Sequence, residues 1–181
     1  MGGGAVARVA IAALAVACSD DSRGSTTGST GAPPAAPCAA GDPVLRVDLI
    51  QVAAAAVDDA LGGPQQFFEV NATALLVNLF VARSNGTTAT PYVYVDGTLT
   101  ADEPLPGASG STFTTDALSF DPRRVTGCVA VELPESEPTV FEVVGGPNNA
   151  VRYSVAVAST AGGQLVVEVA GDGTILSVDP V

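Results

Sequence analysis

The sequence predicts an α+β fold built from two pseudo-repeats, each a helix followed by three to four antiparallel strands. Three short matches, which recur in the same order in both halves, predict the duplication. They are Asp42-Pro43 with Asp121-Pro122, Phe68-Glu69-Val70 with Phe141-Glu142-Val143, and Asp96-Gly97-Thr98 with Asp172-Gly173-Thr174. We therefore expect half-repeats at about 42–100 and 121–181, joined by a connector at 101–120, in one sheet with both helices on one face.

Each half begins with a helix signal, an aspartate that can cap the helix and a proline that suits its first position. From Val47 to Leu61, apolar residues recur at helical spacing, and Gly62-Gly63-Pro64 then stops the helix. The second helix, which follows Asp121, is shorter and weaker because Gly127 is a poor helix former. Two one-sided helices of this kind are typical of packing against a sheet.

Seven segments with alternating or β-rich composition predict the strands. They cover residues 67–71, 74–82, 91–96, 139–144, 150–159, 164–170 and 174–178. Short turns rich in glycine, asparagine and aspartate separate most of them, and Asp96-Gly97 has the composition of a type I′ hairpin turn. Because short links join antiparallel neighbours, we expect one antiparallel sheet.

The N-terminus has the regions of a secretory signal: Arg8 as its only charge, a short apolar run, and small residues before Cys18. This segment resembles a bacterial lipoprotein signal peptide with its lipobox, although Ala15 stands where leucine is usual. The resemblance implies removal of residues 1–17, acylation of Cys18, and anchoring at the outer face of the cytoplasmic membrane. The alternatives are an ordinary signal cleaved near Ala17 and a misassigned start.

The segment after the signal, residues 18–37, is rich in Ser, Thr, Gly and Pro and predicts a disordered tether from the lipidated cysteine. Residues 38–181 then form a single domain. Within it, Cys38 and Cys128 are expected to form a disulfide, because an exported chain folds in an oxidising compartment. In the chain-entropy model such a bond contributes about 4 kcal/mol. The alternative is that Cys128 is a buried free thiol.

The charge balance excludes several classes of function. The chain has 19 acidic residues, 7 basic residues and no histidine, with a net charge of −12. It lacks the clustered Lys and Arg that phosphate contacts need, so no nucleic-acid partner is expected. It also lacks the usual general base and the commonest metal ligand, and no acidic cluster has calcium-loop spacing. We therefore expect no enzyme activity, no metal and no cofactor.

One face of the sheet is expected to carry aromatic side chains, because alternate strand residues point to opposite faces. The residues expected to face the helices are Phe68, Val70, Leu75, Val77, Leu79, Val93 and Val95. The residues expected on the open face are Phe67, Leu76, Phe80, Tyr92 and Tyr94. Such a face is typical of an interaction surface. The alternative is that the connector folds over it as core through Leu105, Phe113 and Leu118.

The helix-then-sheet plan resembles the tandem repeats of PepSY-like domains and of β-lactamase-inhibitory-protein-like folds. This resemblance is architectural, and it implies an exported protein with a binding or inhibitory role. The first hypothesis is therefore a binding module that docks a protein or a cell-wall component on the aromatic face. The second is a carrier of a lipid or another apolar envelope ligand, held in a cavity between the helices and the sheet.

Overall fold

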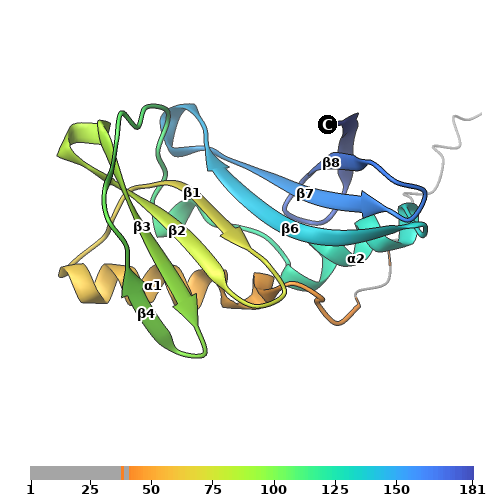
Figure 1. Ribbon diagram of the computed structural model, residues 1–181, viewed down its shortest axis with the longest axis horizontal. Coiled ribbons are helices and arrows are strands. Elements are labelled where there is room, and N and C mark those ends of the chain that lie inside the picture. The colour runs from red at the N-terminus through yellow and green to blue at the C-terminus, as the bar shows by residue number, and fades with distance from the viewer. Residues whose placement is uncertain (1–37, 39–40) are drawn as a thin grey trace, which may run out of the picture. The chain divides into compact units, whose positions relative to one another are not determined.

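The computed structural model describes residue 38 and residues 41–181, which lie within one compact unit, Ala36–Val181. The expected signal peptide at residues 1–17, the lipidated Cys18 and the tether at 18–37 lie outside the described residues and stay predictions. The described chain has the α+β fold predicted above: two α-helices contact one nine-stranded antiparallel sheet (Figure 1).

Seven strands and both helices lie close to their predicted positions. The helices are α1 (Ile50–Leu61) and α2 (Pro122–Glu132). The strands are β1 (Phe67–Ala72), β2 (Val77–Arg83), β3 (Thr88–Val95), β4 (Thr98–Ala101), β5 (Leu105–Pro106), β6 (Ser136–Gly145), β7 (Val151–Ser159), β8 (Gln164–Val169) and β9 (Ile175–Pro180). Strands β4 and β5 were not predicted, because two to four residues are too few for a periodic signal.

The strand order divides the sheet into two matching halves. It runs β4-β3-β2-β1-β6-β7-β8-β9, and β5 pairs with β3. Strands β1 and β6 pair at the centre of the sheet. On each side of this pair, the strands of one half follow in chain order toward the edge of the sheet, and each half has one α-helix before its strands. In the central register Val70 lies opposite Val143, and these are the valines of the repeated Phe-Glu-Val segments. The sheet order therefore agrees with an internal duplication about these valines.

The start of α2 is as predicted. The Asp121 side chain accepts hydrogen bonds from Arg123 N at 2.9 Å and Arg124 N at 3.3 Å. Pro122 occupies the first turn, where its missing N–H costs no helical hydrogen bond. Helix α2 is therefore capped locally by its own sequence.

The predicted start of the first helix at Asp42 is wrong. The backbone at Leu45 is extended, and Arg46 N donates a hydrogen bond to Thr73 O at 2.8 Å. A 3₁₀ turn at Arg46–Leu49 then leads into α1. The chain is held extended here because Leu45 is buried in the core and its neighbour is bonded to the turn after β1.

Both helices bury their apolar residues against the same face of the sheet and share one core (Figure 1). The helical contribution consists mainly of Ile50, Ala53, Ala54, Val57, Val125 and Val129. Alternate residues of the strands supply the other side, among them Val70, Val77, Leu79, Phe141, Val143, Val155 and Val167. The opposite face of the sheet carries no helix among the described residues, and it is called the open face below.

The two cysteines expected to pair lie close together. The Cα atoms of Cys38 and Cys128 are 5.1 Å apart, a distance that a disulfide spans. Cys128 is buried on α2, and Cys38 precedes the first helical turn. The distance supports the predicted pairing, which would tie the start of the folded unit to α2.

Candidate binding face of the sheet

Three of the five side chains expected on the open face lie on the helix face instead. Phe67 is fully buried, and Tyr92 and Tyr94 are only 9% and 8% exposed. All three belong to the core that contacts the helices. The prediction that they line an exposed aromatic surface is therefore wrong.

A β-bulge explains the position of Phe67. Phe67 lies opposite Val81 and Glu69 lies opposite Phe80, so β1 holds one extra residue between these two pairs. Strict alternation would place Phe67 and Val70 on opposite faces, but the bulge brings both to the helix face, where both are buried.

The register between β2 and β3 explains the tyrosines. Tyr92 lies opposite Leu79 and Tyr94 lies opposite Val77, and both partners are buried under the helices. Residues directly opposite each other in neighbouring strands share a face. The alternation in β3 is thus shifted by one residue from the prediction, which places Val93 and Val95 on the open face.

The connector covers part of the expected aromatic set, as the alternative reading proposed. Phe113 is buried, its ring centroid is 5.9 Å from that of Phe67, and two backbone hydrogen bonds of 2.8 and 2.9 Å join these residues. Leu118 is also buried, whereas Leu105 is exposed. Further along, Phe120 packs 5.4 Å from the ring of Tyr153. The connector is therefore part of the core at Phe113 and Leu118.

Two of the five expected side chains remain accessible. Phe80 lies on the open face and is half-buried. Leu76 is half-buried in the turn between β1 and β2, where its N–H donates to the Thr73 hydroxyl at 3.2 Å. Leu75, expected to face the helices, is 77% exposed because it belongs to the same turn. These residues do not form an aromatic surface.

The open face carries instead a row of polar side chains across six strands. Each member lies directly opposite the next in the register of neighbouring strands. The row consists of Asn78 (β2), Asn71 (β1), Glu142 (β6), Ser154 (β7), Glu168 (β8) and Ser177 (β9). We call it the polar row. It was not predicted, because strand register joins residues that are far apart in the sequence.

Hydrogen bonds orient the centre of the polar row. Asn78 Nδ2 donates to Asn71 Oδ1 at 2.8 Å, and Asn71 Nδ2 donates to Glu69 Oε1 at 2.7 Å. On the other side, Ser154 Oγ donates to Glu142 Oε2 at 3.2 Å. The Asn71 amide and the Ser154 hydroxyl therefore each donate to a carboxylate in the middle of the face.

These two carboxylates are the glutamates of the repeated Phe-Glu-Val segments. Glu69 lies opposite Val144 and Glu142 lies opposite Asn71, so the two glutamates are diagonal neighbours across β1 and β6. Burial raises the pKa of Glu69, the bond from Asn71 lowers it, and the nearby Glu142 carboxyl raises it again. The repeat thus places two like charges side by side at the centre of the open face.

A shallow groove extends this acidic centre toward the C-terminal strands. It has a volume of about 270 Å³ and lies over β6, β7, β8 and β9. Its charged lining comprises three carboxylates and one guanidinium, from Glu142, Glu168, Asp179 and Arg152. We call it the acidic groove. Its net negative charge suits a ligand group that is cationic.

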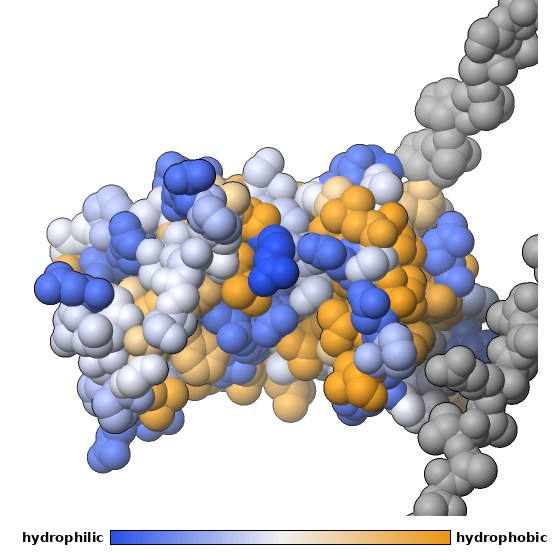
Figure 2. Space-filling model, turned by 90° about the horizontal axis from the view of Figure 1, so that it is seen from above, coloured by the Kyte–Doolittle hydropathy of each residue, from blue (hydrophilic) through white to orange (hydrophobic). Residues whose placement is uncertain are grey.

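Apolar side chains accompany the acidic groove without forming a continuous surface. Figure 2, seen from the side away from the helices of Figure 1, shows hydrophobic areas separated by hydrophilic ones. The aliphatic residues that line the acidic groove are Val144 and Val166, and both are half-buried. A face of this mixed kind has the composition of a protein-binding surface with a polar centre.

Among residues 38 and 41–181, no group of three or more His, Cys, Asp or Glu side chains is placed to hold a metal ion. In the same part of the chain, no helix has the length and apolar composition of a membrane span. The chain matches no protein-family model, no curated protein and no solved structure. Its function is therefore inferred from the geometry of its own residues.

The assignment of β3 side chains to faces predicts that the same substitution has very different effects on stability at two adjacent residues. A Tyr94→Asp substitution places a carboxylate in the core and is expected to destabilise the fold by about 3 kcal/mol or more. A Val95→Asp substitution, on the open face where Val95 is 38% exposed, is expected to change the unfolding free energy by less than about 1 kcal/mol. Urea unfolding followed by circular dichroism measures both, and equal losses would contradict the assignment.

The raised pKa of Glu69 predicts a pH-dependent stability. The folded state holds this proton more tightly than the unfolded state, so stability is lost as the pH rises from the unfolded toward the folded pKa. A Glu69→Gln variant keeps a neutral side chain at every pH and is expected to gain stability relative to the parent as the pH rises above the unfolded pKa of about 4.3. Glu137→Gln, an exposed acid on β6, is the matched control and is expected to show no such gain.

Proposed function

We propose that this chain is an exported, membrane-anchored binding module whose open face docks a protein that presents arginine or lysine side chains. The acidic groove carries the proposal, because three of its four charged residues are carboxylates. Four members of the polar row line the groove, and among them the Ser154 and Ser177 hydroxyls offer hydrogen-bond donors and acceptors beside these charges. A helix-free face with this chemistry supports docking more than catalysis.

The charge of the whole chain supports a cationic partner. The sequence has a net charge of −12, so its field attracts a basic protein and increases the association rate at low salt. The same field disfavours nucleic acid and acidic partners. The carboxylates of the acidic groove then select which basic surface binds.

The duplicated architecture supports a docking function, because it gives one continuous sheet with a face that no helix covers among the described residues. A helix and four strands occur twice, and the halves meet through β1 and β6. A lipid at Cys18 and the tether at 18–37 would hold the folded domain at the membrane surface of the cell envelope. The carrier hypothesis has less support, since the helix-facing side chains of the sheet pack directly against the helices.

A double variant in the acidic groove tests the docking proposal. Glu168→Gln with Asp179→Asn removes two charges and is expected to weaken binding of an arginine-rich peptide by about twofold to tenfold. The control, Asp48→Asn with Asp59→Asn, removes the same charge from exposed positions around α1. Isothermal titration calorimetry at low and physiological salt measures both.

Two outcomes of this titration overturn the proposal. Equal losses in the groove and control variants would mean that the peptide responds only to the net charge. An affinity of the parent protein that is too weak to measure even at low salt would mean that the groove attracts no cationic group. Loss confined to the groove variant supports docking on the open face.

The anchor predicts a separate result in the natural host. A Cys18→Ala variant is expected to leave the membrane fraction, because the acyl chains would have no attachment site. Mass spectrometry of the mature N-terminus of the parent protein is expected to show an acylated cysteine. An unmodified Cys18 would instead support the ordinary-signal alternative, and it would leave the docking proposal untouched.

A further inference from the structure

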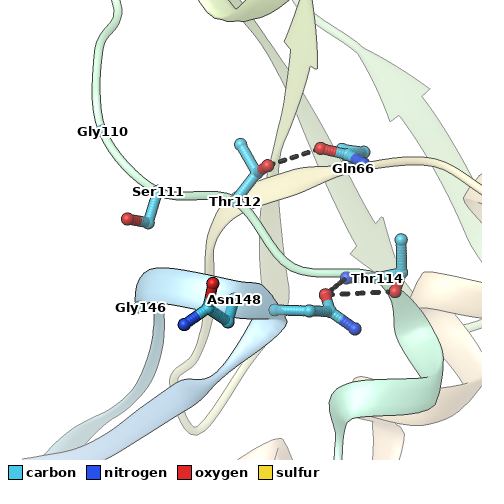
Figure 3. A pocket seen from close by; sticks show the side chains of 8 residues that line it. Gln66, Gly110, Ser111, Thr112, Thr114, Gly146 and Asn148 are labelled. Carbon is cyan, nitrogen blue, oxygen red and sulfur yellow. Dashed lines mark hydrogen bonds between the residues drawn. The ribbon is translucent and has the colours of Figure 1, made fainter.

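A second hollow lies at one end of the sheet, where the connector passes the turns after β2 and β6. Its first part has a volume of about 520 Å³ and is lined by Gln66, Gly110, Ser111, Thr112, Thr114, Gly146, Asn148 and Asn149 (Figure 3). An adjoining part of about 480 Å³ shares three of these residues and extends along Arg83 to Gly86. We call the two parts together the polar cleft.

The connector is fixed against both walls of the polar cleft. On one wall, Phe113 forms two backbone hydrogen bonds with Phe67, the first residue of β1. On the opposite wall, a Cβ atom at Gly145 would lie 2.4 Å from Ser111 O, so only glycine allows this close approach. The backbone of residues 111–113 is therefore held in place without a ligand.

Hydrogen bonds between the walls set the direction of the side chains. The Thr112 hydroxyl donates to Gln66 Oε1, and the Thr114 backbone nitrogen donates to Asn149 Oδ1 at 2.9 Å (Figure 3). The Thr114 hydroxyl donates to the Asp116 carboxylate. The first two bonds use the amide oxygens of Gln66 and Asn149. Their NH₂ groups remain as donors to a bound molecule.

The turn after β6 presents its asparagines in an uncommon conformation. Asn148 and Asn149 are consecutive left-handed residues with φ of 58° and 60°. Such residues carry backbone strain and are enriched at binding and catalytic sites. Here the conformation directs the Asn148 side chain into the space between the turn and Ser111 (Figure 3).

The chemistry of the lining selects the class of ligand. The first part of the polar cleft contains amide and hydroxyl side chains with no charged group. In the second part the guanidinium of Arg83 donates to Gln65 Oε1 at 2.8 Å. Neutral groups that both donate and accept match a ligand rich in hydroxyls, and they give little affinity for an ion or a lipid chain.

An aromatic ring lies beside the second part of the polar cleft. Phe68, the extra residue of the β1 bulge, lies beside Gly86, where a Cβ atom would be 3.9 Å from its ring. This half-buried ring borders the wall of the second part at Gly86, and it offers an apolar surface to the C–H face of a sugar ring that extends that far.

We propose that the polar cleft binds a neutral oligosaccharide. The proposal goes beyond the docking function, because no residue of the acidic groove takes part in it. A glycan site at the end of the sheet would leave the open face available to a protein partner, so the chain would contact both.

Nuclear magnetic resonance titration of the purified protein tests the proposal. The probes are the β-1,4-linked tetramer of N-acetylglucosamine and maltotetraose, and tetragalacturonate is the charged comparison. Binding of a neutral probe is expected to shift the amide signals of Gln66, Thr112, Asn148 and Asn149. Tetragalacturonate carries a carboxylate on every sugar, the first part of the cleft has no charged lining residue, and the single Arg83 guanidinium in the second part can compensate only one carboxylate, so weaker binding is expected.

The matched variants are glycine substitutions at left-handed turn positions. Asn148→Gly keeps the backbone conformation but removes an amide from the polar cleft, and is expected to weaken binding by about threefold to tenfold. Asp96→Gly makes the same change in the β3–β4 turn, where φ is 48°, and is expected to leave the affinity unchanged.

Three results overturn the proposal. They are no shifts with either neutral probe at millimolar concentrations, shifts that map to the open face, and equal losses in the two glycine variants. Failure of this test leaves the arginine-peptide titration unaffected, because the two experiments monitor different residues.

Discussion

The antiparallel pairing of β1 with β6 is the interaction on which the rest of the structure depends. It joins two helix-and-strand halves whose central edges would otherwise expose unpaired backbone groups. Because Val70 and Val143 face each other in this register, the repeated glutamates come together on the other face. One strand pair therefore creates the shared core, the continuous open face and its acidic centre.

The bulge at Phe68 decides how the two faces are used. It turns Phe67 toward the helices, where the ring meets Phe113 and the connector becomes part of the core. It also leaves Glu69 on the open face, beside Glu142. A single extra residue thus determines both the position of the connector and the chemistry at the centre of the sheet.

The two proposed sites differ in chemistry because different parts of the fold supply them. The acidic groove is built from strand residues, so their separation is set by the regular spacing of the sheet. The polar cleft is built from turns and the connector, whose backbone is held by glycine contacts and hydrogen bonds. A charged, regular face suits a protein surface, whereas a neutral, concave end suits a small polar ligand.

The sequence by itself determined the α+β class, the two helices, seven of the strands and the cap at Asp121, because each depends on residues close together in the chain. It did not determine the position of Tyr92 and Tyr94, since a shift of one residue in a strand exchanges its two faces. The polar row was also hidden, because its members are neighbours only through strand register. Local periodicity therefore predicted the elements, and tertiary pairing decided which side chains reach the surface.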